Sequence, residues 1–182
     1  MAKQNTRIVQ PCGREAEETP PGRRDNAGVY CLLLWLPRAT RLGFGRRGRC
    51  HLDRGWYVYT GSAKRNLASR LARHLRRWKR LHWHIDRLRA VARIREVWVW
   101  PWTPGGECKQ NGMVRELPGG TYPARGFGAS DCRCYAHLVA FPFQPAPPGP
   151  GAPLRYRRGV AAVSMSRRLP NGSSPDCSQK RT

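Results

Sequence analysis

The stretch GWYVYTGSAKRNLASRLARH (55–74) decides how this chain folds. Its alternating aromatic and β-branched residues over 56–60 predict a strand, and the small residues Gly-Ser-Ala at 61–63 predict a turn. A helix is predicted to follow, because apolar residues recur at helical spacing from Leu67 and Asn66 is a suitable N-cap. A turn of small residues that leads into a basic helix favours phosphate binding at the helix N-terminus.

Hydrophobic patterns on either side of this stretch predict the remaining elements. The nearly continuous apolar run GVYCLLLWL (28–36) predicts a central strand, and the glycine-punctuated residues 42–55 predict a loop or a short hairpin. Three or four strands with helices between them favour a small mixed sheet flanked by helices. The other predicted elements are a second helix from near His82, a strand over 96–102, a short helix within 107–117 that Asn111 and Gly112 interrupt, and a strand over 136–143 that Pro142 places at a sheet edge.

The inward faces of the two main helices follow from the same spacing. The residues predicted to face the core are Leu67, Leu71, Leu75 and Trp78 on the first helix and Ile85, Leu88 and Val91 on the second.

Two segments differ in composition from the rest of the chain. Residues 1–27 are polar and turn-rich, and residues 145–182 are rich in Pro, Gly, Ser and Arg. Both lack the apolar content that a packed core needs, so they are predicted to be disordered tails. The domain is predicted to span residues 28–144.

The charge of the chain indicates its class of partner. Lys and Arg number 34 against 11 Asp and Glu, which gives a formal net charge of +23. An excess this one-sided predicts attraction to polyanions, above all nucleic acid. No apolar run approaches the roughly 18 residues of a membrane span, and seven cysteines without a secretory signal favour reduced thiols in the cytoplasm.

The first predicted helix concentrates this charge. Eight Lys and Arg and no acidic residue lie between Lys64 and Arg80. Neighbouring like charges repel on a helix, so an anion is expected opposite them. Arg70 and His74 are four residues apart and therefore share a face. The predicted nucleic-acid-binding residues are Lys64, Arg65, Arg73, Arg76, Arg77 and Arg80.

Several of these residues match a known pattern. The chain resembles the GIY-YIG nuclease superfamily in Gly28-Val29-Tyr30, in Tyr59-Thr60-Gly61, and in Arg70 and His74 on the next helix. It is similar above all to a prokaryotic subgroup of unknown function, some of whose members are fused to an endonuclease III-type repair enzyme. The motifs similar to that subgroup are GWYVYTGSA, RLARH, HWHID (82–86), Glu107-Cys108 and GFGASDCRCYAHL (126–138).

The resemblance implies both a fold and a chemistry. The expected fold is a mainly antiparallel three-stranded central sheet flanked by helices, and the expected activity is phosphodiester hydrolysis with one divalent ion, Mg²⁺ or Mn²⁺. Glu107 corresponds to the metal-binding glutamate, with Glu96 and Glu116 as alternatives. The implied partner is nucleic acid, with DNA favoured, and a DNA-repair glycosylase is a further partner to consider.

The same resemblance implies roles for four residues. Tyr30 would act as a base with help from basic neighbours and the metal ion, since a free phenol has a pKa of about 10. Arg70 would stabilise the pentacovalent oxyanion. Tyr59 and His74 would orient water or phosphate by hydrogen bonds. His84 and Asp86 are candidates for groups that support the site.

Other interpretations of the sequence stay open. Cys132, Cys134 and His137 have the spacing of half a zinc site, with Cys108 or His51 as a further ligand. The sequence favours the simpler interpretation, in which these cysteines pack as small apolar side chains. For function, the rivals of a nuclease are a catalytically inactive nucleic-acid-binding module and an RNA-associated protein.

Overall fold

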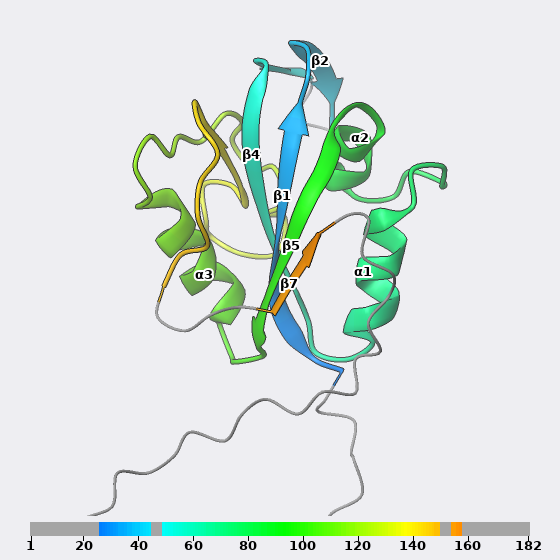
Figure 1. The fold of residues 1–182 in the computed structure, drawn as a ribbon, viewed down its shortest axis with the longest axis vertical. Helices are drawn as coiled ribbons and strands as arrows, with labels where there is room; N and C mark the ends of the chain where they lie inside the picture. The colour runs from blue at the N-terminus through cyan, green and yellow to red at the C-terminus, as the bar shows by residue number, and fades with distance from the viewer. Residues whose placement is uncertain (1–25, 45–48, 150–153, 158–182) are drawn as a thin grey trace, which may run out of the picture.

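The structure is a computed structural model that describes residues 26–44, 49–149 and 154–157. Most of the predicted tails, 1–27 and 145–182, lies outside the described residues. In chain order the elements are β1 (Gly28–Leu36), β2 (Thr40–Gly43), β3 (Arg49–Leu52), β4 (Gly55–Ala63), α1 (Leu67–Leu75), α2 (His84–Val91), β5 (Arg93–Pro101), α3 (Gly106–Arg115), β6 (Leu138–Phe141) and β7 (Leu154–Arg157) (Figure 1).

The main sheet confirms the predicted fold class. Its five strands stand in the order β6-β4-β1-β5-β7, and their pairings are antiparallel. The three inner strands β4, β1 and β5 are the predicted central ones, and β6 lies at an edge as predicted. At the other edge, β7 pairs with β5 and lies within the segment predicted to be a tail. The predicted loop or hairpin at 42–55 overlaps the small β2–β3 hairpin, which begins at Thr40.

Strand β1 is apolar along its length because both of its faces are covered. Helices α1 and α2 lie on one side of the sheet and α3 lies on the other (Figure 1). Alternate residues of β1, Tyr30 among them, pack in the core on the α1 and α2 side, and Cys31 and Leu33 pack with Trp98 and Val114 on the α3 side. A strand covered on both faces gives the continuous apolar pattern seen in the sequence.

The first helix is shorter than predicted. It ends at Leu75, which is 48% exposed, and Trp78 is 89% exposed rather than inward. Arg89 of α2 donates from Nη2 to the Leu75 carbonyl oxygen at 3.1 Å, which satisfies one of the carbonyls that a helix end leaves free. A longer helix would also bring the arginines at 73, 76, 77 and 80 together on adjacent turns, where like charges repel.

The predicted turn at 61–63 is wrong, because these residues belong to β4. The chain turns after them, and Asn66 lies in the left-handed region at φ 58° without a capping hydrogen bond from its side chain. Asn26 caps α1 instead. Its carbonyl oxygen accepts from the Leu67 N–H and its Oδ1 accepts from the Ala68 N–H, both at 2.9 Å. Residues 61–63 therefore do not form the helix N-terminus at which phosphate binding was expected.

The other two helices differ from the predictions in detail. Helix α2 begins at His84, and it buries Ile85 and Leu88 as predicted but leaves Val91 exposed. Helix α3 continues through Asn111 and Gly112. The Asn111 side chain is buried and donates to the Ala136 carbonyl oxygen at 2.8 Å, so it joins the helix to the segment before β6.

Among the described residues, no helix is both long and apolar enough to cross a membrane.

Candidate active site

A pocket of about 260 Å³ lies beside the last residues of β4. Strand β6 pairs with β4 only as far as Tyr59, so Gly61 and Ser62 project beyond the end of that pairing. Side chains from both sides of the sheet reach the pocket there. The predicted catalytic residues and the predicted metal ligand all line it: Tyr30, Tyr59, Arg70, His74 and Glu107.

Gly61 makes room for the Tyr30 ring. The two residues are paired across β1 and β4, and a Cβ on Gly61 would lie 2.6 Å from both Cζ and the hydroxyl oxygen of Tyr30. Glycine is therefore required at this position if Tyr30 is to point into the pocket, which accounts physically for the glycine of the Tyr-Thr-Gly motif.

Replacing Gly61 with alanine is expected to displace the Tyr30 ring and to lower the free energy of unfolding by about 1–3 kcal/mol, as overpacking does. Chemical denaturation measures the effect. Gly112→Ala is the matched control, because a Cβ on Gly112 of α3 meets nothing within 4 Å and alanine is the better helix former by up to about 1 kcal/mol. A Gly61→Ala protein as stable as the wild type would contradict the close contact.

The Tyr30 hydroxyl is hydrogen-bonded to Nε2 of His74 at 2.8 Å. Burial, followed by the charge of Lys79, lowers the pKa of His74 to about 3, so the ring is neutral. Its Nδ1 is buried without a hydrogen-bond partner among the described residues. A buried N–H without a partner is rarer than a buried acceptor without one, which favours the tautomer with the proton on Nε2. In that tautomer His74 donates to the Tyr30 oxygen.

The acidity of Tyr30 reflects two opposing influences. Burial raises the pKa of Tyr30 above its ordinary value, and the positive charge of Arg70 lowers it. Arg70 also lines the pocket, where its guanidinium carbon lies 5.3 Å from the centre of the Trp83 ring. Contact with an aromatic face restricts the orientation of the guanidinium without neutralising it.

Glu107 lies in the first turn of α3 and reaches the pocket as a carboxylate. Its Oε2 accepts from the Ser62 hydroxyl at 2.5 Å, and its Oε1 accepts from Nδ1 of His137 at 2.8 Å. Burial alone would raise the pKa of Glu107, but the hydrogen bonds from His137 and Ser62 outweigh it and lower the pKa.

The two alternative glutamates lie elsewhere. Glu96 is buried in β5, where its Oε2 accepts from the Trp98 indole N–H at 2.9 Å. Glu116 is the C-cap of α3 and does not line the pocket. Of the three candidates for a metal ligand, the pocket contains Glu107.

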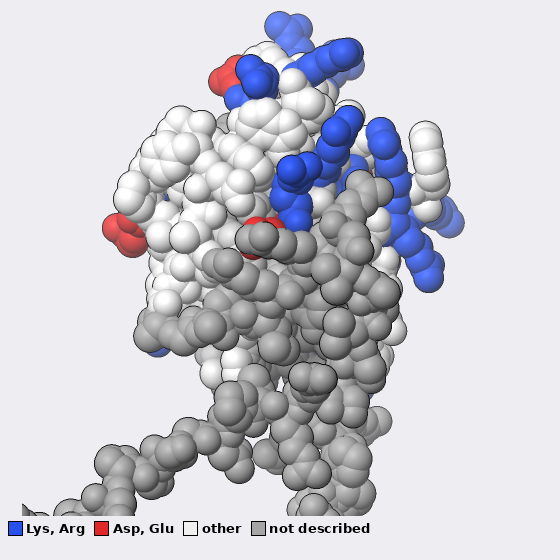
Figure 2. Space-filling model, in the orientation of Figure 1, with Lys and Arg blue, Asp and Glu red and all other residues white. Residues whose placement is uncertain are grey.

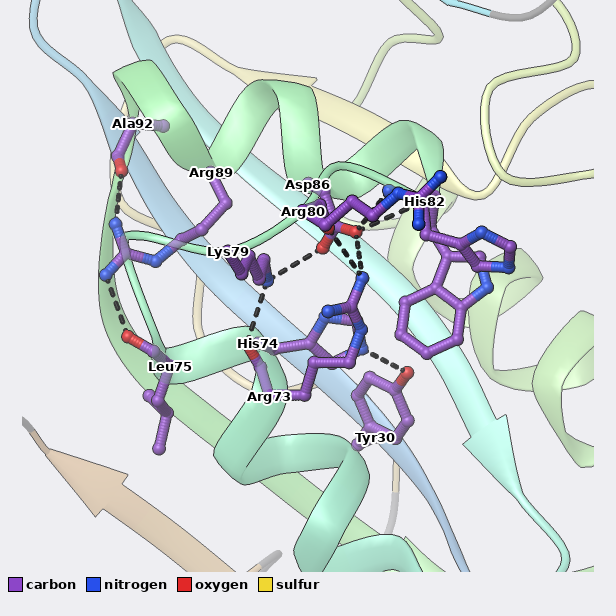
Figure 3. A network of polar contacts seen from close by, with 11 residues as sticks. Tyr30, Arg73, His74, Leu75, Lys79, Arg80, His82, Asp86, Arg89 and Ala92 are labelled. Atoms are coloured by element: carbon purple, nitrogen blue, oxygen red, sulfur yellow. Dashed lines mark hydrogen bonds and ion pairs between the residues drawn. The ribbon is translucent and has the colours of Figure 1, made fainter.

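Asp86 lies behind the pocket wall rather than in the pocket. It is 1% exposed, and Arg73 and Lys79 form ion pairs with it at 2.6 and 2.7 Å (Figure 3). Its Oδ2 also accepts from the backbone N–H groups of His82 and Trp83, at 3.0 and 3.1 Å. Asp86 therefore fixes the segment that places Trp83 beside Arg70. His84 does line the pocket, and its Nδ1 accepts from the Gly128 N–H at 3.1 Å.

Comparison with known proteins gives one match. Residues 29–148 match the family model described as Domain of unknown function DUF123. The chain belongs to this family. No curated protein and no solved structure matches the chain. The residues that line the pocket all fall inside the matched range.

Basic residues of the DUF123 domain are concentrated on two parts of its surface. Figure 2 shows Lys and Arg side chains over the side of the molecule that contains α1 and α2, and at the end formed by β2 and β3. Arg73 differs from the other predicted nucleic-acid contacts, because its guanidinium is engaged with Asp86 and with the Arg80 carbonyl oxygen. The remaining predicted contacts are exposed: Lys64, Arg65, Arg76, Arg77 and Arg80.

Three residues of the DUF123 domain matter more at this site than the sequence indicated. In the sequence, Trp83 had no role beyond its place in HWHID (82–86), Ser62 was assigned to a turn, and His137 was considered only as a zinc ligand. Trp83 lies beside Arg70, and the other two hold Glu107. An aromatic residue between His82 and His84 was a usable signal for Trp83. The contacts of Ser62 and His137 with Glu107 join residues 45 and 30 positions apart, so no local pattern reveals them.

Proposed function

We propose that this DUF123 domain is a divalent-metal-dependent endonuclease of the GIY-YIG type, which hydrolyses phosphodiester bonds in DNA during repair. One observation supports this most strongly. Two tyrosines from β1 and β4, Arg70 and His74 from α1 and Glu107 from α3 converge on one pocket, and the family resemblance had assigned these same residues to catalysis. Tyr30, Arg70 and Glu107 come from β1, α1 and α3. Other strands or helices separate these three elements in the sequence.

Tyr30 has the geometry of a general base. Because His74 donates to the Tyr30 oxygen, the hydroxyl proton of Tyr30 is free to point into the pocket, and His74 would stabilise the phenolate once that proton is lost. Arg70 favours the same ionisation, since its charge lowers the pKa of Tyr30. A water molecule between Tyr30 and a bound phosphate would then be activated for in-line attack.

Arg70 is placed to receive a phosphate oxygen. It is a cation at a pocket wall, and contact with Trp83 restricts its motion. A guanidinium held in advance of the reaction can donate two parallel hydrogen bonds to the negative charge that develops on phosphorus oxygens. The exposed basic residues near α1 would hold the flanking phosphates of the strand.

The pocket also fits a divalent cation. Glu107 is ionised, and each of its oxygens has one hydrogen-bond partner, which leaves lone pairs for further contacts. Mg²⁺ is commonly held by one or two carboxylates together with waters and substrate phosphate, and exposed Asp131 lines the same pocket as a second carboxylate. When bound, the ion supplies positive charge that offsets the charge of the reacting phosphate.

Cleavage of labelled nucleic acids tests the proposal. Plain, nicked, flapped and abasic DNA, with RNA counterparts, are incubated with Mg²⁺, Mn²⁺ or EDTA. We expect metal-dependent cutting that falls at least about 100-fold in Glu107→Gln, as for loss of an electrostatic stabiliser. Glu116→Gln is the matched control, because Glu116 ends the same helix outside the pocket. Cutting in EDTA, or equal activity of the two variants, would contradict the proposal.

The burial of Tyr30 favours a second candidate, an inactive nucleic-acid-binding module. Burial raises the pKa of Tyr30, and a phenol that stays protonated cannot act as a base. The same experiment separates the two candidates. Binding that is tight and falls steeply with salt, without cutting of any substrate, identifies the binding module, and preference for RNA identifies an RNA-associated role.

A further inference from the structure

Three cysteines and one histidine gather behind Glu107. Cys108 follows Glu107 on α3, Cys132 and Cys134 lie on the segment before β6, and His137 immediately precedes β6. One ligand atom from each lies within 4.8 Å of all the others. Nε2 of His137 is 3.4 Å from the Cys132 sulfur and 3.9 Å from the Cys108 sulfur. None of the three cysteines forms a disulfide.

The spacing of these atoms agrees with one metal geometry. A tetrahedral zinc ion has bonds of about 2.3 Å to sulfur and 2.0–2.1 Å to nitrogen, which separates its ligand atoms by roughly 3.5–3.8 Å. Sulfur and imidazole ligands in a set of four select zinc over the hard ions that carboxylates bind. His51 is not part of the group, since it pairs with Asp53 on the β2–β3 hairpin.

The orientation of His137 gives an independent indication. Its Nδ1 is 2.8 Å from Oε1 of Glu107, and an ionised carboxylate can only accept a hydrogen bond. The proton of His137 therefore lies on Nδ1, and the lone pair of Nε2 points among the sulfurs. Histidine ligands of zinc typically donate their second ring N–H to a carboxylate in this way.

We propose that Cys108, Cys132, Cys134 and His137 form a closed structural zinc site. The site joins the first turns of α3 to the segment 126–137, three of whose residues line the pocket: Gly128, Ser130 and Asp131. It also orients Glu107 through His137. The importance of orienting Glu107 rests on the proposed function, whereas zinc binding itself does not.

Metal analysis of the purified full-length chain tests the site. We expect close to one zinc per chain in the wild type after purification in reducing buffer. Replacement of zinc by Co²⁺ should give the visible absorption of a tetrahedral ion and the near-ultraviolet band of cobalt–thiolate bonds. This measurement uses the intact chain and does not require any variant to fold.

Single-cysteine variants then identify the ligands. Cys132→Ser and Cys134→Ser are each expected to lose zinc or to bind it far more weakly, and to lose about one third of the thiolate band, because one of three sulfurs is removed. Cys50→Ser is the matched control, since Cys50 is a half-buried free cysteine on β3 outside the group. Glu107→Gln should retain zinc with affinity reduced about 10- to 100-fold, as for the partner of a ligating histidine.

The possible outcomes separate the two proposals. A chain without zinc that also fails to bind Co²⁺ through thiolates overturns the zinc site, even if it cuts DNA. Zinc loss in Cys50→Ser equal to that in Cys132→Ser also overturns it. A chain that holds zinc through these ligands but cuts no substrate establishes the zinc site and contradicts only the nuclease.

Discussion

Asp86→Ala is expected to lower the free energy of unfolding by about 3–5 kcal/mol, as removal of one partner from a buried ion pair does. The substitution leaves the ammonium group of Lys79 buried, since that side chain is only 5% exposed. It also leaves two backbone N–H groups at the start of α2 without their acceptor. Urea denaturation at neutral pH measures the loss. The measurement is made at low temperature, so that Asp86→Ala is folded in the absence of urea and its free energy of unfolding can be determined.

The control for this experiment is Asp53→Ala. Asp53 is also paired, with His51 at 3.2 Å, but its side chain is 86% exposed, so we expect a change of at most about 1 kcal/mol. Equal losses of unfolding free energy in the two variants would show that burial does not account for the contribution of Asp86 to stability.

The pH dependence of stability gives a second test of Asp86. Burial would raise the pKa of Asp86, but hydrogen bonds from Lys79 and from the His82 and Trp83 amides lower it below its ordinary value of 3.8. As the pH falls, Asp86 therefore becomes protonated in the unfolded state before it does in the folded state. The stabilisation by the Asp86 carboxylate is complete above about pH 4. It declines as the pH falls from 3.8 toward the lower pKa of the folded state. The stability difference between the wild type and Asp86→Asn should shrink over that range.

In the proposed endonuclease, Arg70→Lys is expected to reduce the rate of cleavage about 10²- to 10³-fold while DNA affinity changes little. Lysine keeps the positive charge, so the attraction to phosphate remains, but it cannot donate two parallel hydrogen bonds or stack on Trp83 as arginine does. Single-turnover cleavage with saturating enzyme measures the rate, and a salt titration of binding measures the affinity.

Arg95→Lys provides the matched control, because Arg95 is exposed on β5 and does not line the pocket. Its rate of cleavage should equal that of the wild type. If Arg70→Lys cut at the wild-type rate but bound DNA with a lower salt slope, Arg70 would be a contact for the strand and not a catalytic group.

The sheet was predictable because its signal is local. The apolar run of β1 and the alternation of β4 reflect burial of each strand's own side chains, so the pattern lies within the strand itself. The end of α1 was not predictable in this way. Trp78 continues the helical spacing, yet it is exposed, and the helix ends where Arg89 from α2 contacts the Leu75 carbonyl. The helix cap likewise comes from Asn26, which precedes β1 and is separated from α1 by four strands in the sequence.

The lining of the candidate site was predictable where it consists of motif residues. Tyr30, Tyr59, Arg70 and His74 were identified before their positions in space were known, and they line one pocket. The role of Gly61 was predicted wrongly. A glycine at this position suggested a turn, whereas the structure requires glycine there because Tyr30 on the neighbouring strand leaves no room for a side chain. Cys108 joins Cys132, Cys134 and His137 because α3 packs beside β6. The spacing of Cys132 and His137 in the sequence does not specify that packing.

The capping of α1 by Asn26 sets a limit on where the domain can be cut for expression. A fragment designed on the family match, 29–148, would lack Asn26, and loss of an N-cap costs about 0.5–2 kcal/mol. It would also lack β7, which would leave β5 as an open edge available to other chains. A fragment that begins upstream of Asn26 and extends past Arg157 keeps both contacts, and it is the better choice for crystallisation or isotope labelling.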